Sequence, residues 1–524
     1  MARQAMGEGH SRRSFLTSTG VAAAVSLAGF VGVTQGSGQE DPSRITITLA
    51  TEPLTLDPQN HEHTETDIVM RHAYEKLVTR DPDGEIIPHL ADDWERIEPG
   101  HVRFWLVDET ITFHEGGELT AEDVAYSINR IVDDDVGIAS PQRTFIAGVD
   151  SAEVAEDGAA VDVFSPDLNA GVFDNFAAVG GQVIQQSWVE EADDETIATE
   201  MNGTGPYRLE EYTEDVEVFL TRYEDYWGEQ PDAEEVLITW TGEASPRVSA
   251  LLAGETDIAV NVPPEEVPRV EESEEAYVAT VPSARSIFCP MNANREPFTS
   301  VEFRQAMNYA YDQERMIEDV LMGFAEPTSQ PVLEGMVGYN EELDPYPHDP
   351  ERAEELVEES GFAGAEIVLH TPTDRYLKDV ETAQALASDI NGLENVSCEA
   401  ELRDFGALVD ETFDVDEDTG PSFWLIGWGN TAFHPDFIVE PHLTPDGITR
   451  QYVDDEDGNE LFAEARSEED DDRREELYQE LMAHYHEQAP WVFSHQQFSV
   501  YGLNERIEWE PRPDEVVDAQ AMGL

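Results

Sequence analysis

Two closely spaced histidine pairs are the first residues in this chain whose types could support chemistry. They are His61 with His63, and His484 with His486. Imidazole nitrogens are common zinc ligands, and a zinc site needs several ligands that converge on one point. Residues two apart on a helix point in different directions, so neither pair converges by itself. We therefore expect surface histidines and no metal site.

An acidic stretch, "DDEDGNELFAE", is a second place where a cation could bind. Some of its residues stand at the offsets of a calcium-binding loop, namely Asp455, Asp457, Gly458 and Glu464. The first ligand position of such a loop falls on Val453, which has no side-chain oxygen. The stretch therefore predicts a solvated acidic loop.

Familiar enzyme motifs are absent from the sequence. No G-x-S-x-G, H-E-x-x-H, C-x-x-C, Walker A or G-x-G-x-x-G pattern occurs. Lys76 and Lys378 are the only lysines, which leaves few candidates for a Schiff base or a phosphate-binding role. We expect no catalytic residues and no cofactor, with an exported hydrolase as a minor alternative.

The N-terminal segment has the pattern of an export signal. Arg12 and Arg13 precede an apolar run, residues 21–33, that is too short to cross a hydrocarbon core needing roughly 20 residues. The paired arginines resemble the twin-arginine signal that exports folded proteins through the Tat route. Phe30 occupies the position at which a lipoprotein has its lipidated cysteine. We expect an exported protein at the outer face of the cytoplasmic membrane, without a lipid anchor on Phe30.

The charge balance is strongly acidic. The chain has 114 Asp and Glu against 29 Lys and Arg, a formal net charge of -85. In molar salt the Debye length falls to about 3 Å, so repulsion that would open this chain in dilute buffer is screened. The composition predicts a protein of halophilic type that loses its fold at low salt. Nucleic acid and anionic lipid are poor partners for such a surface.

Two further sequence features leave alternatives open. Cys289 and Cys398 are too few for a disulfide framework, and they could form one bond or remain free. Asn202 and Asn395 each begin a glycosylation pattern, and Asn395 is the better acceptor because Asn202 lies in a Gly-rich stretch.

The remaining sequence alternates between strand and helix patterns, which favours an α/β fold. Residues 44–50 and 102–107 alternate as strands do, and residues 67–80 have helical spacing. Thr120 and Asp123 form a capping box before another helix. Further helices are expected to open at residues 299–302, 349–350 and 379, and further strands to cover residues 365–370, 397–402 and 423–428.

Several segments, in this order, resemble the extracytoplasmic solute-binding proteins of dipeptide, oligopeptide and nickel ABC importers, solute-binding family 5. The resemblance covers nearly the whole chain after the signal. The segments include "PLTLDP" (53–58), "AYEKLVTRDPDGEIIPHLADDW" (73–94), "FHEGGELTAEDVAYSINR" (113–130), "GTGPYRL" (203–209), "GETDI" (254–258) and "EPFTSVEFRQAMNYAYDQERMI" (296–317).

The resemblance implies a two-lobed, Venus-flytrap α/β fold of the periplasmic-binding-protein type, with an extra subdomain inserted in lobe one. The ligand is expected between the lobes. The implied domains are a signal and linker (1–42), lobe one (43–82, 200–287 and 488–524), its inserted subdomain (83–199) and lobe two (288–487).

The same resemblance implies a set of ligand-binding residues. Dipeptide-binding relatives clamp the ligand carboxylate with an Arg, which corresponds to Arg375 beside Tyr376. Peptide-binding members carry G-W-x-x-D, with the Asp holding the peptide amine, whereas this chain reads "GWGNT" and has Thr431 at that position. Other residues that the resemblance places at the cleft are Trp428, Asn430, Glu52, Asn261, Met291 and Asn292.

These implied roles have alternatives. Arg375 could instead pair with a surface acid, and Trp428 could simply be a core residue. The missing acid at Thr431 argues against a free-amine peptide, although Glu52 could hold the amine instead.

The resemblance implies a non-catalytic subunit of an ABC importer that captures a peptide or similar small solute. We expect a monomer whose partners are that solute and the transmembrane permease. The alternatives are another ligand in the same family, such as a metal chelate or a sugar, and a secreted chaperone or scaffold.

Overall fold

The computed structural model describes residues 43–524 apart from positions 62, 83, 134, 135, 137, 139, 147, 157, 179, 180, 374, 413–419, 446 and 450–454. The predicted signal and linker, including Phe30, and the position Val453 therefore lie outside the described residues. The strands are β1 (Arg44–Leu49), β2 (Val78–Arg80), β3 (Ile86–Pro88), β4 (Ala91–Glu98), β5 (His101–Leu106), β6 (Ser151–Val154), β7 (Ala160–Phe164), β8 (Tyr207–Thr213), β9 (Glu217–Arg222), β10 (Glu235–Trp240), β11 (Ile258–Ala259), β12 (Ala276–Pro290), β13 (Ala325–Pro327), β14 (Ala365–Pro372), β15 (Val396–Arg403), β16 (Ile426–Gly429) and β17 (Trp491–Asn504).

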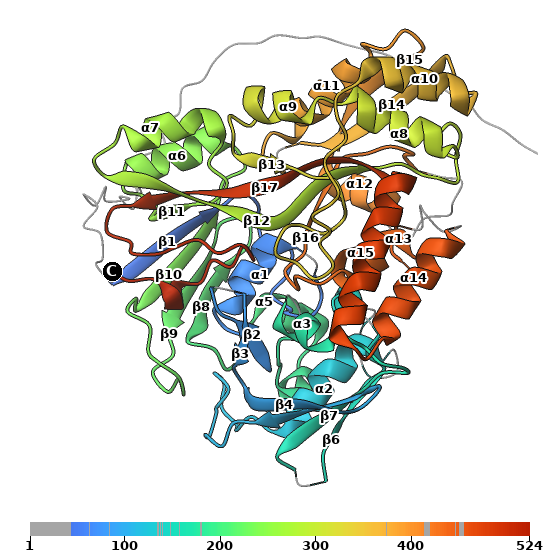
Figure 1. Cartoon of the computed structure of the whole chain (residues 1–524). Coiled ribbons are helices and arrows are strands. Elements are labelled where there is room, and N and C mark those ends of the chain that lie inside the picture. Colours follow the sequence, from blue (N-terminus) through green and yellow to red (C-terminus); the bar gives the residue numbers. More distant parts are fainter. Residues whose placement is uncertain are drawn as a thin grey trace, which may run out of the picture. The chain divides into compact units, whose positions relative to one another are not determined.

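Helices alternate with these strands along the chain (Figure 1). The α-helices are α1 (Thr64–Arg71), α2 (Ala121–Val132), α3 (Val172–Ala177), α4 (Gln186–Glu191), α5 (Asp194–Thr199), α6 (Ala244–Leu252), α7 (Val267–Glu271), α8 (Val301–Ala310), α9 (Gln313–Asp319), α10 (Pro350–Ser360), α11 (Asp379–Ile390), α12 (Phe405–Thr412), α13 (Asp436–Leu443), α14 (Glu456–Ser467) and α15 (Asp471–Gln488). Short 3-10 helices are η1 (Pro141–Thr144), η2 (Pro264–Glu266) and η3 (Ala519–Ala521).

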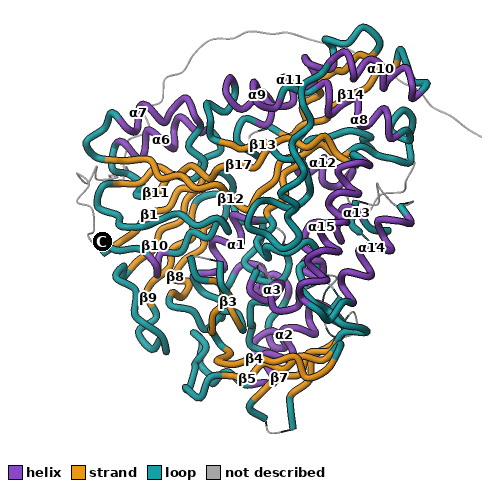
Figure 2. The backbone as a smooth tube through the Cα atoms, viewed as in Figure 1, coloured by secondary structure: helices purple, strands orange, loops and turns teal. Residues whose placement is uncertain are grey.

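The largest sheet in the described chain has nine strands in the order β16-β12-β17-β11-β1-β10-β9-β8, with β13 paired to β17. Its two long strands, β12 and β17, are antiparallel and remain paired from Ala276 opposite Asn504 to Pro290 opposite Trp491. Figure 2 shows these strands extending from the side of the sheet near β11 and β1 toward the part of the chain that contains α8 and α11. A register shift between Pro282 and Ser286 interrupts the ladder near its middle. Arg285 lies in this irregular stretch.

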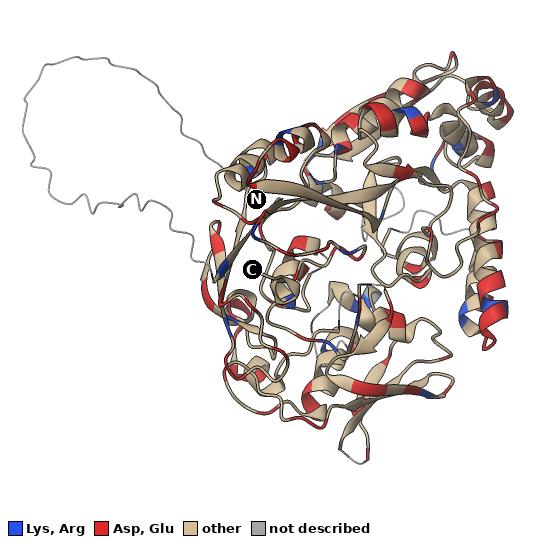
Figure 3. Cartoon of the chain, turned by 60° about the vertical axis from the view of Figure 1, so that its left-hand side comes forward, with Lys and Arg blue, Asp and Glu red and all other residues tan. Residues whose placement is uncertain are grey.

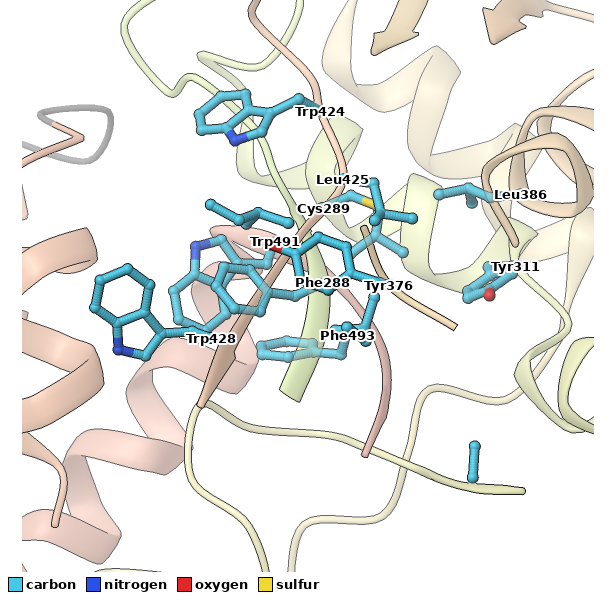
Figure 4. Close-up of a cluster of buried hydrophobic side chains, with 14 of the residues drawn as sticks. Phe288, Cys289, Tyr311, Tyr376, Leu386, Trp424, Leu425, Trp428, Trp491 and Phe493 are labelled. Atoms are coloured by element: carbon cyan, nitrogen blue, oxygen red, sulfur yellow. The ribbon is translucent and has the colours of Figure 1, made fainter. Parts of the chain in front are cut away.

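Three apolar clusters form the core. One is built around β1, α1 and β8 to β10. A second lies between α2 and the four-stranded antiparallel sheet β4-β5-β7-β6. The third extends from α8, α10, α11 and α15 along β12 and β17, and Figure 4 shows part of it, with Phe288 stacked on Trp491 at a centroid distance of 4.0 Å. The domain boundaries expected from the resemblance stay a prediction.

Local signals explain several helix ends. Thr120 and Asp123 form the expected capping box on α2. Asp349 caps α10 and Gly361 ends it with a left-handed backbone, φ 81°, which glycine adopts at little cost. The helix expected from residue 299 begins at Val301, because the side chain of Ser300 accepts the capping bond from the Phe303 amide.

The helix predicted over residues 67–80 was wrong in its extent, because α1 ends at Arg71. The apolar spacing that suggested a longer helix belongs to a buried turn. There the backbone carbonyls of His72 and Ala73 accept hydrogen bonds from Tyr207 and Gly205 at 3.0 and 2.9 Å. These carbonyls therefore pair with a distant segment instead of extending α1.

The acidic stretch at residues 454–464 was also interpreted wrongly as a loop, since most of it forms α14. Asp455 caps this helix through the Gly458 amide and contacts His484 Nε2 at 2.8 Å. His486 instead contacts the carbonyl of Ser329 at 2.9 Å, so the two histidines of this pair have separate partners. No group of metal-binding side chains is found among the described residues.

Other features of the sequence have clear positions. Cys289 and Cys398 are both buried and free. Asn202 is fully buried, with its side chain bonded to the Glu115 amide and to Gln185. In the described part of the chain, no helix combines the length and apolar character needed to cross a membrane.

Candidate functional site

A cavity of about 310 Å³ lies where segments from distant parts of the sequence meet. Its volume is at the low end of the ~300–1,000 Å³ typical of small-molecule sites. The lining residues are Leu54, Asn60, His61, His63, Thr64, Asp67, Pro141, Phe145, Arg285, Arg375, Tyr376, Phe405, Val409, Ile426, Gly427, Trp428, Gly429, Thr431, Phe437, Asp514 and Glu515.

Arg285 on β12 organises one wall of the cavity. Its Nε and Nη2 donate to the two carboxylate oxygens of Glu515 at 3.0 and 2.5 Å. Nη2 also donates to Thr64 Oγ1 at 3.0 Å, and Nη1 points to the Gly427 carbonyl at 3.4 Å. Burial lowers the pKa of Arg285, but the adjacent Glu515 outweighs this effect and raises it overall. Arg285 therefore stays charged and joins α1, β16 and the C-terminal segment.

Arg375 is a second cation at the cavity, and it is held mainly by aromatic rings. Its guanidinium carbon lies 5.0 Å from the ring centroid of Tyr376 and 5.2 Å from that of Phe405. The nearest carboxylate oxygen, Glu65 Oε1, is 3.6 Å from Nη1, which is longer than a hydrogen bond. Its Nε is buried and has no hydrogen-bond partner within the described structure. Arg375 thus retains donor capacity toward a ligand.

His61 and His63 are buried residues that line the cavity, so the expectation of surface histidines was wrong for this pair. Burial lowers the pKa of His63 to about 4, with Glu65 opposing and Arg375 adding to the shift. Burial likewise lowers the pKa of His61. Both imidazoles are therefore neutral near pH 7 and supply polar but uncharged surface.

Aromatic rings form most of the remaining wall. Phe145 and Phe437 are stacked with centroids 5.0 Å apart, and Trp428 lies 6.4 Å from Phe145. Trp428 Nε1 donates to the Phe437 carbonyl at 2.7 Å, which fixes the indole while its face remains at the cavity. Tyr376 is fixed in a similar way, through its hydroxyl to the Gly427 carbonyl at 3.1 Å.

The structure brings some of the predicted ligand-binding residues together. Arg375, Tyr376, Trp428 and Thr431 all line the cavity. Asn261 borders a smaller adjoining space of about 30 Å³ instead. Whether these residues bind ligand stays a prediction.

Other predicted site residues lie outside the cavity lining. Glu52 accepts hydrogen bonds from the Asp215 amide at 2.8 Å and the Tyr212 hydroxyl at 3.5 Å. Asn430 is buried and bonds His434 at both ends of its amide group. Met291 and Asn292 are buried where the segment after β12 pairs with residues near β16.

Sequence reasoning missed several cavity residues. The largest omission is the pair Arg285 and Glu515, which are 230 residues apart. A single arginine within the otherwise uncharged stretch "VPSARSIFCP" was the available signal for Arg285, because a buried cation requires a partner. Nothing in the sequence around Glu515 distinguishes it from the many other acids.

Comparison with known proteins shows the family. Residues 85–450 match the model for bacterial extracellular solute-binding proteins, family 5. The chain belongs to this family. It is an extracytoplasmic solute-binding subunit of an ABC importer and not an enzyme, which confirms the expected function class.

Similar proteins match over most of their length. The di/tripeptide-binding protein 2 of Pseudomonas aeruginosa is 23% identical, with 87% of this chain and 90% of that protein covered. The periplasmic binding protein DppA of Helicobacter pylori, solved with the peptide STSA, has a TM-score of 0.82 at 20% identity and covers 92% and 98% of the two chains. NikA of Staphylococcus aureus, solved with Ni(L-His)2, has a TM-score of 0.78 at 18% identity, covering 92% and 99%. These structures confirm the two-lobed α/β fold.

Proposed function

We propose that this chain captures a peptide or similar small solute bearing a carboxylate, and delivers it to the membrane permease by lobe closure. The observation that carries the proposal is Arg375, a cation at the cavity whose buried Nε lacks a hydrogen-bond partner in the described structure. A ligand carboxylate would supply that partner through a charge-assisted, two-point bond. Such a bond contributes about 1.5–3 kcal/mol.

Contacts between the predicted lobes support a mechanism of closure around the ligand. Lys378 Nζ pairs with Glu265 Oε1 at 2.5 Å, and the Leu377 amide donates to Gln497 Oε1 at 3.1 Å. A ligand can shift the balance between open and closed forms only through contacts that are better in the closed form. Arg375 and Trp428 lie beside such contacts, so a ligand bound to both side chains would favour the closed form.

The relatives leave more than one ligand class open. The named relatives are a di/tripeptide-binding protein, a protein solved with the peptide STSA and one solved with a nickel–histidine complex, so a metal chelate remains the second candidate within the same fold. Export through the Tat route, adaptation to high salt and a monomeric state are further parts of the proposal that rest on sequence.

Calorimetric titration in molar KCl with a panel of di- and tripeptides and with Ni(L-His)2 tests the proposal. We expect a peptide to bind, and Arg375→Ala to weaken binding about ten- to a hundredfold. The matched control is Arg352→Ala on α10, because Arg352 pairs only with the exposed acids Glu355 and Glu359 among the contacts described for its side chain. Equal loss of binding in both variants, or binding of the nickel complex alone, would contradict the proposed ligand class.

A further inference from the structure

The carboxylates at the cavity are already paired. Glu515 receives both of its bonds from Arg285. Asp514 receives two from Arg512, at 3.0 and 2.6 Å. These two acids from the C-terminal segment are therefore satisfied without a ligand.

Asp67 is the third carboxylate among the described lining residues, and it is also occupied. Its Oδ2 pairs with Arg71, and its Oδ1 accepts a bond from Gln182 Nε2 at 2.9 Å. Burial raises the pKa of Asp67, but Arg71 leads the charges that outweigh this and lower it overall. A ligand ammonium that approached any of these acids would have to compete with an arginine already in place.

The two cations at the cavity are not equivalent. Arg285 directs its donors to Glu515, Thr64 and Gly427. Arg375 has its closest acid, Glu65, at 3.6 Å and an Nε without a partner in the described chain. Among the charged residues that line the cavity, the open hydrogen-bonding group is therefore a donor on Arg375, which suits an anion.

The wall formed by Phe145, Trp428 and Phe437 also restricts the kind of ligand that fits the cavity. It offers a broad apolar surface, and the lining residue at position 431 is an uncharged threonine. A ligand ammonium placed against this wall would lose its hydration and gain cation–π attraction from the ring faces, but it would find no charged hydrogen-bond acceptor there. An apolar or aromatic group would instead gain contact area.

From this arrangement we infer that the cavity selects a small monoanionic acid with an apolar or aromatic body, and that an ammonium group on the ligand is not required. A peptide with a blocked amine, or an organic acid of similar size, has this chemistry. The inference rests on the proposed function and narrows its ligand class.

Three matched probes test it: alanyl-phenylalanine, its N-acetyl derivative and its C-terminal amide. The first carries both charges, the second only the carboxylate and the third only the ammonium. In calorimetric titration of the full chain in molar KCl, we expect the N-acetyl derivative to bind at least as tightly as the free dipeptide. We expect the amide to bind at least tenfold more weakly than either. Measurably tighter binding of the free dipeptide than of the N-acetyl derivative would overturn the inference and leave the proposed function intact.

A designed variant gives an independent readout. Thr431→Asp adds a carboxylate to the cavity lining, and Thr431→Asn is the uncharged control of similar size. Relative to Asn, the Asp variant is expected to shift the preference toward the free dipeptide by about tenfold, the usual gain from one charged hydrogen bond. An unchanged preference, with both variants folded by circular dichroism, would count against the inference. If none of the three probes bound the native protein, the proposed carboxylate ligand and this inference would both be overturned.

Discussion

Arg285 and Glu515, 230 residues apart in sequence, form a two-point ion pair at the wall of the cavity, with N–O distances of 3.0 and 2.5 Å. Both side chains are more than nine-tenths buried. The pair connects β12, one of the two long strands, to the C-terminal segment. Its position means that the same interaction supports both the fold and the shape of the binding site.

Removing one partner of this pair is expected to destabilise the protein strongly. Arg285→Met leaves Glu515 as an uncompensated buried charge, and such losses typically cost about 3–5 kcal/mol. The double variant Arg285→Met with Glu515→Leu should recover a large part of that loss, because it removes the stranded charge. Denaturant unfolding in molar KCl measures both effects. If the double variant lost as much free energy of unfolding as the two single variants added together, this account would be contradicted.

His442 is expected to make stability fall with decreasing pH. Its ring lies 4.5 Å from Trp428 and 5.5 Å from Phe288, and neither ring nitrogen has a hydrogen-bond partner within the described structure. Burial lowers the pKa of His442 to about 3 from an ordinary value of 6.5. Below pH 6.5 the unfolded chain binds a proton that the folded chain excludes, so stability falls as the pH decreases toward 3.

The variant His442→Phe isolates this effect. Between pH 7 and pH 5 the native protein should lose about 2 kcal/mol more stability than the variant. The exposed His348, changed to Phe, is the matched control and should follow the native protein. Unfolding curves in molar KCl at the two pH values provide the measurement. If the stability of the native protein and of the His442→Phe variant changed in parallel with pH, His442 would be able to take up a proton in the folded protein.

The sequence predicted those parts of the molecule that depend on neighbouring residues. Asp349 and Gly361 define the ends of α10 because capping is a local property of the backbone. Arg375 and Trp428 could be placed at the site because they belong to recognisable segments. Arg285 and Glu515 could not be paired in advance, because their contact depends on how β12 and the C-terminal segment pack. The same reason explains why the helix expected to continue beyond Arg71 stops there.

Glu52 is a residue for which the family resemblance implied a ligand-binding role, although it lies outside the cavity lining. The sequence suggested that it could hold a ligand amine, but its carboxylate bonds the Asp215 amide and the Tyr212 hydroxyl, away from the cavity lining. Glu52→Gln should therefore change ligand affinity less than twofold, while Arg375→Ala changes it at least tenfold. Titration of the two variants with the same peptide gives the comparison. A loss of affinity in Glu52→Gln comparable to that in Arg375→Ala would return Glu52 to the site.

The acidic surface predicts a strong dependence of stability on salt. Figure 3 shows Asp and Glu positions distributed over helices and strands, with few Lys and Arg among them, in agreement with the net charge of -85. The Debye length decreases from about 30 Å at 0.01 M to about 3 Å at 1 M, so repulsion between acids on different elements is screened only at high salt. We expect the melting temperature to rise by several degrees or more between millimolar and molar KCl. Sucrose, which adds no ionic screening, serves as the control and should not reproduce the full increase. A melting temperature that is the same in both salt concentrations would show that repulsion between these acids does not limit stability.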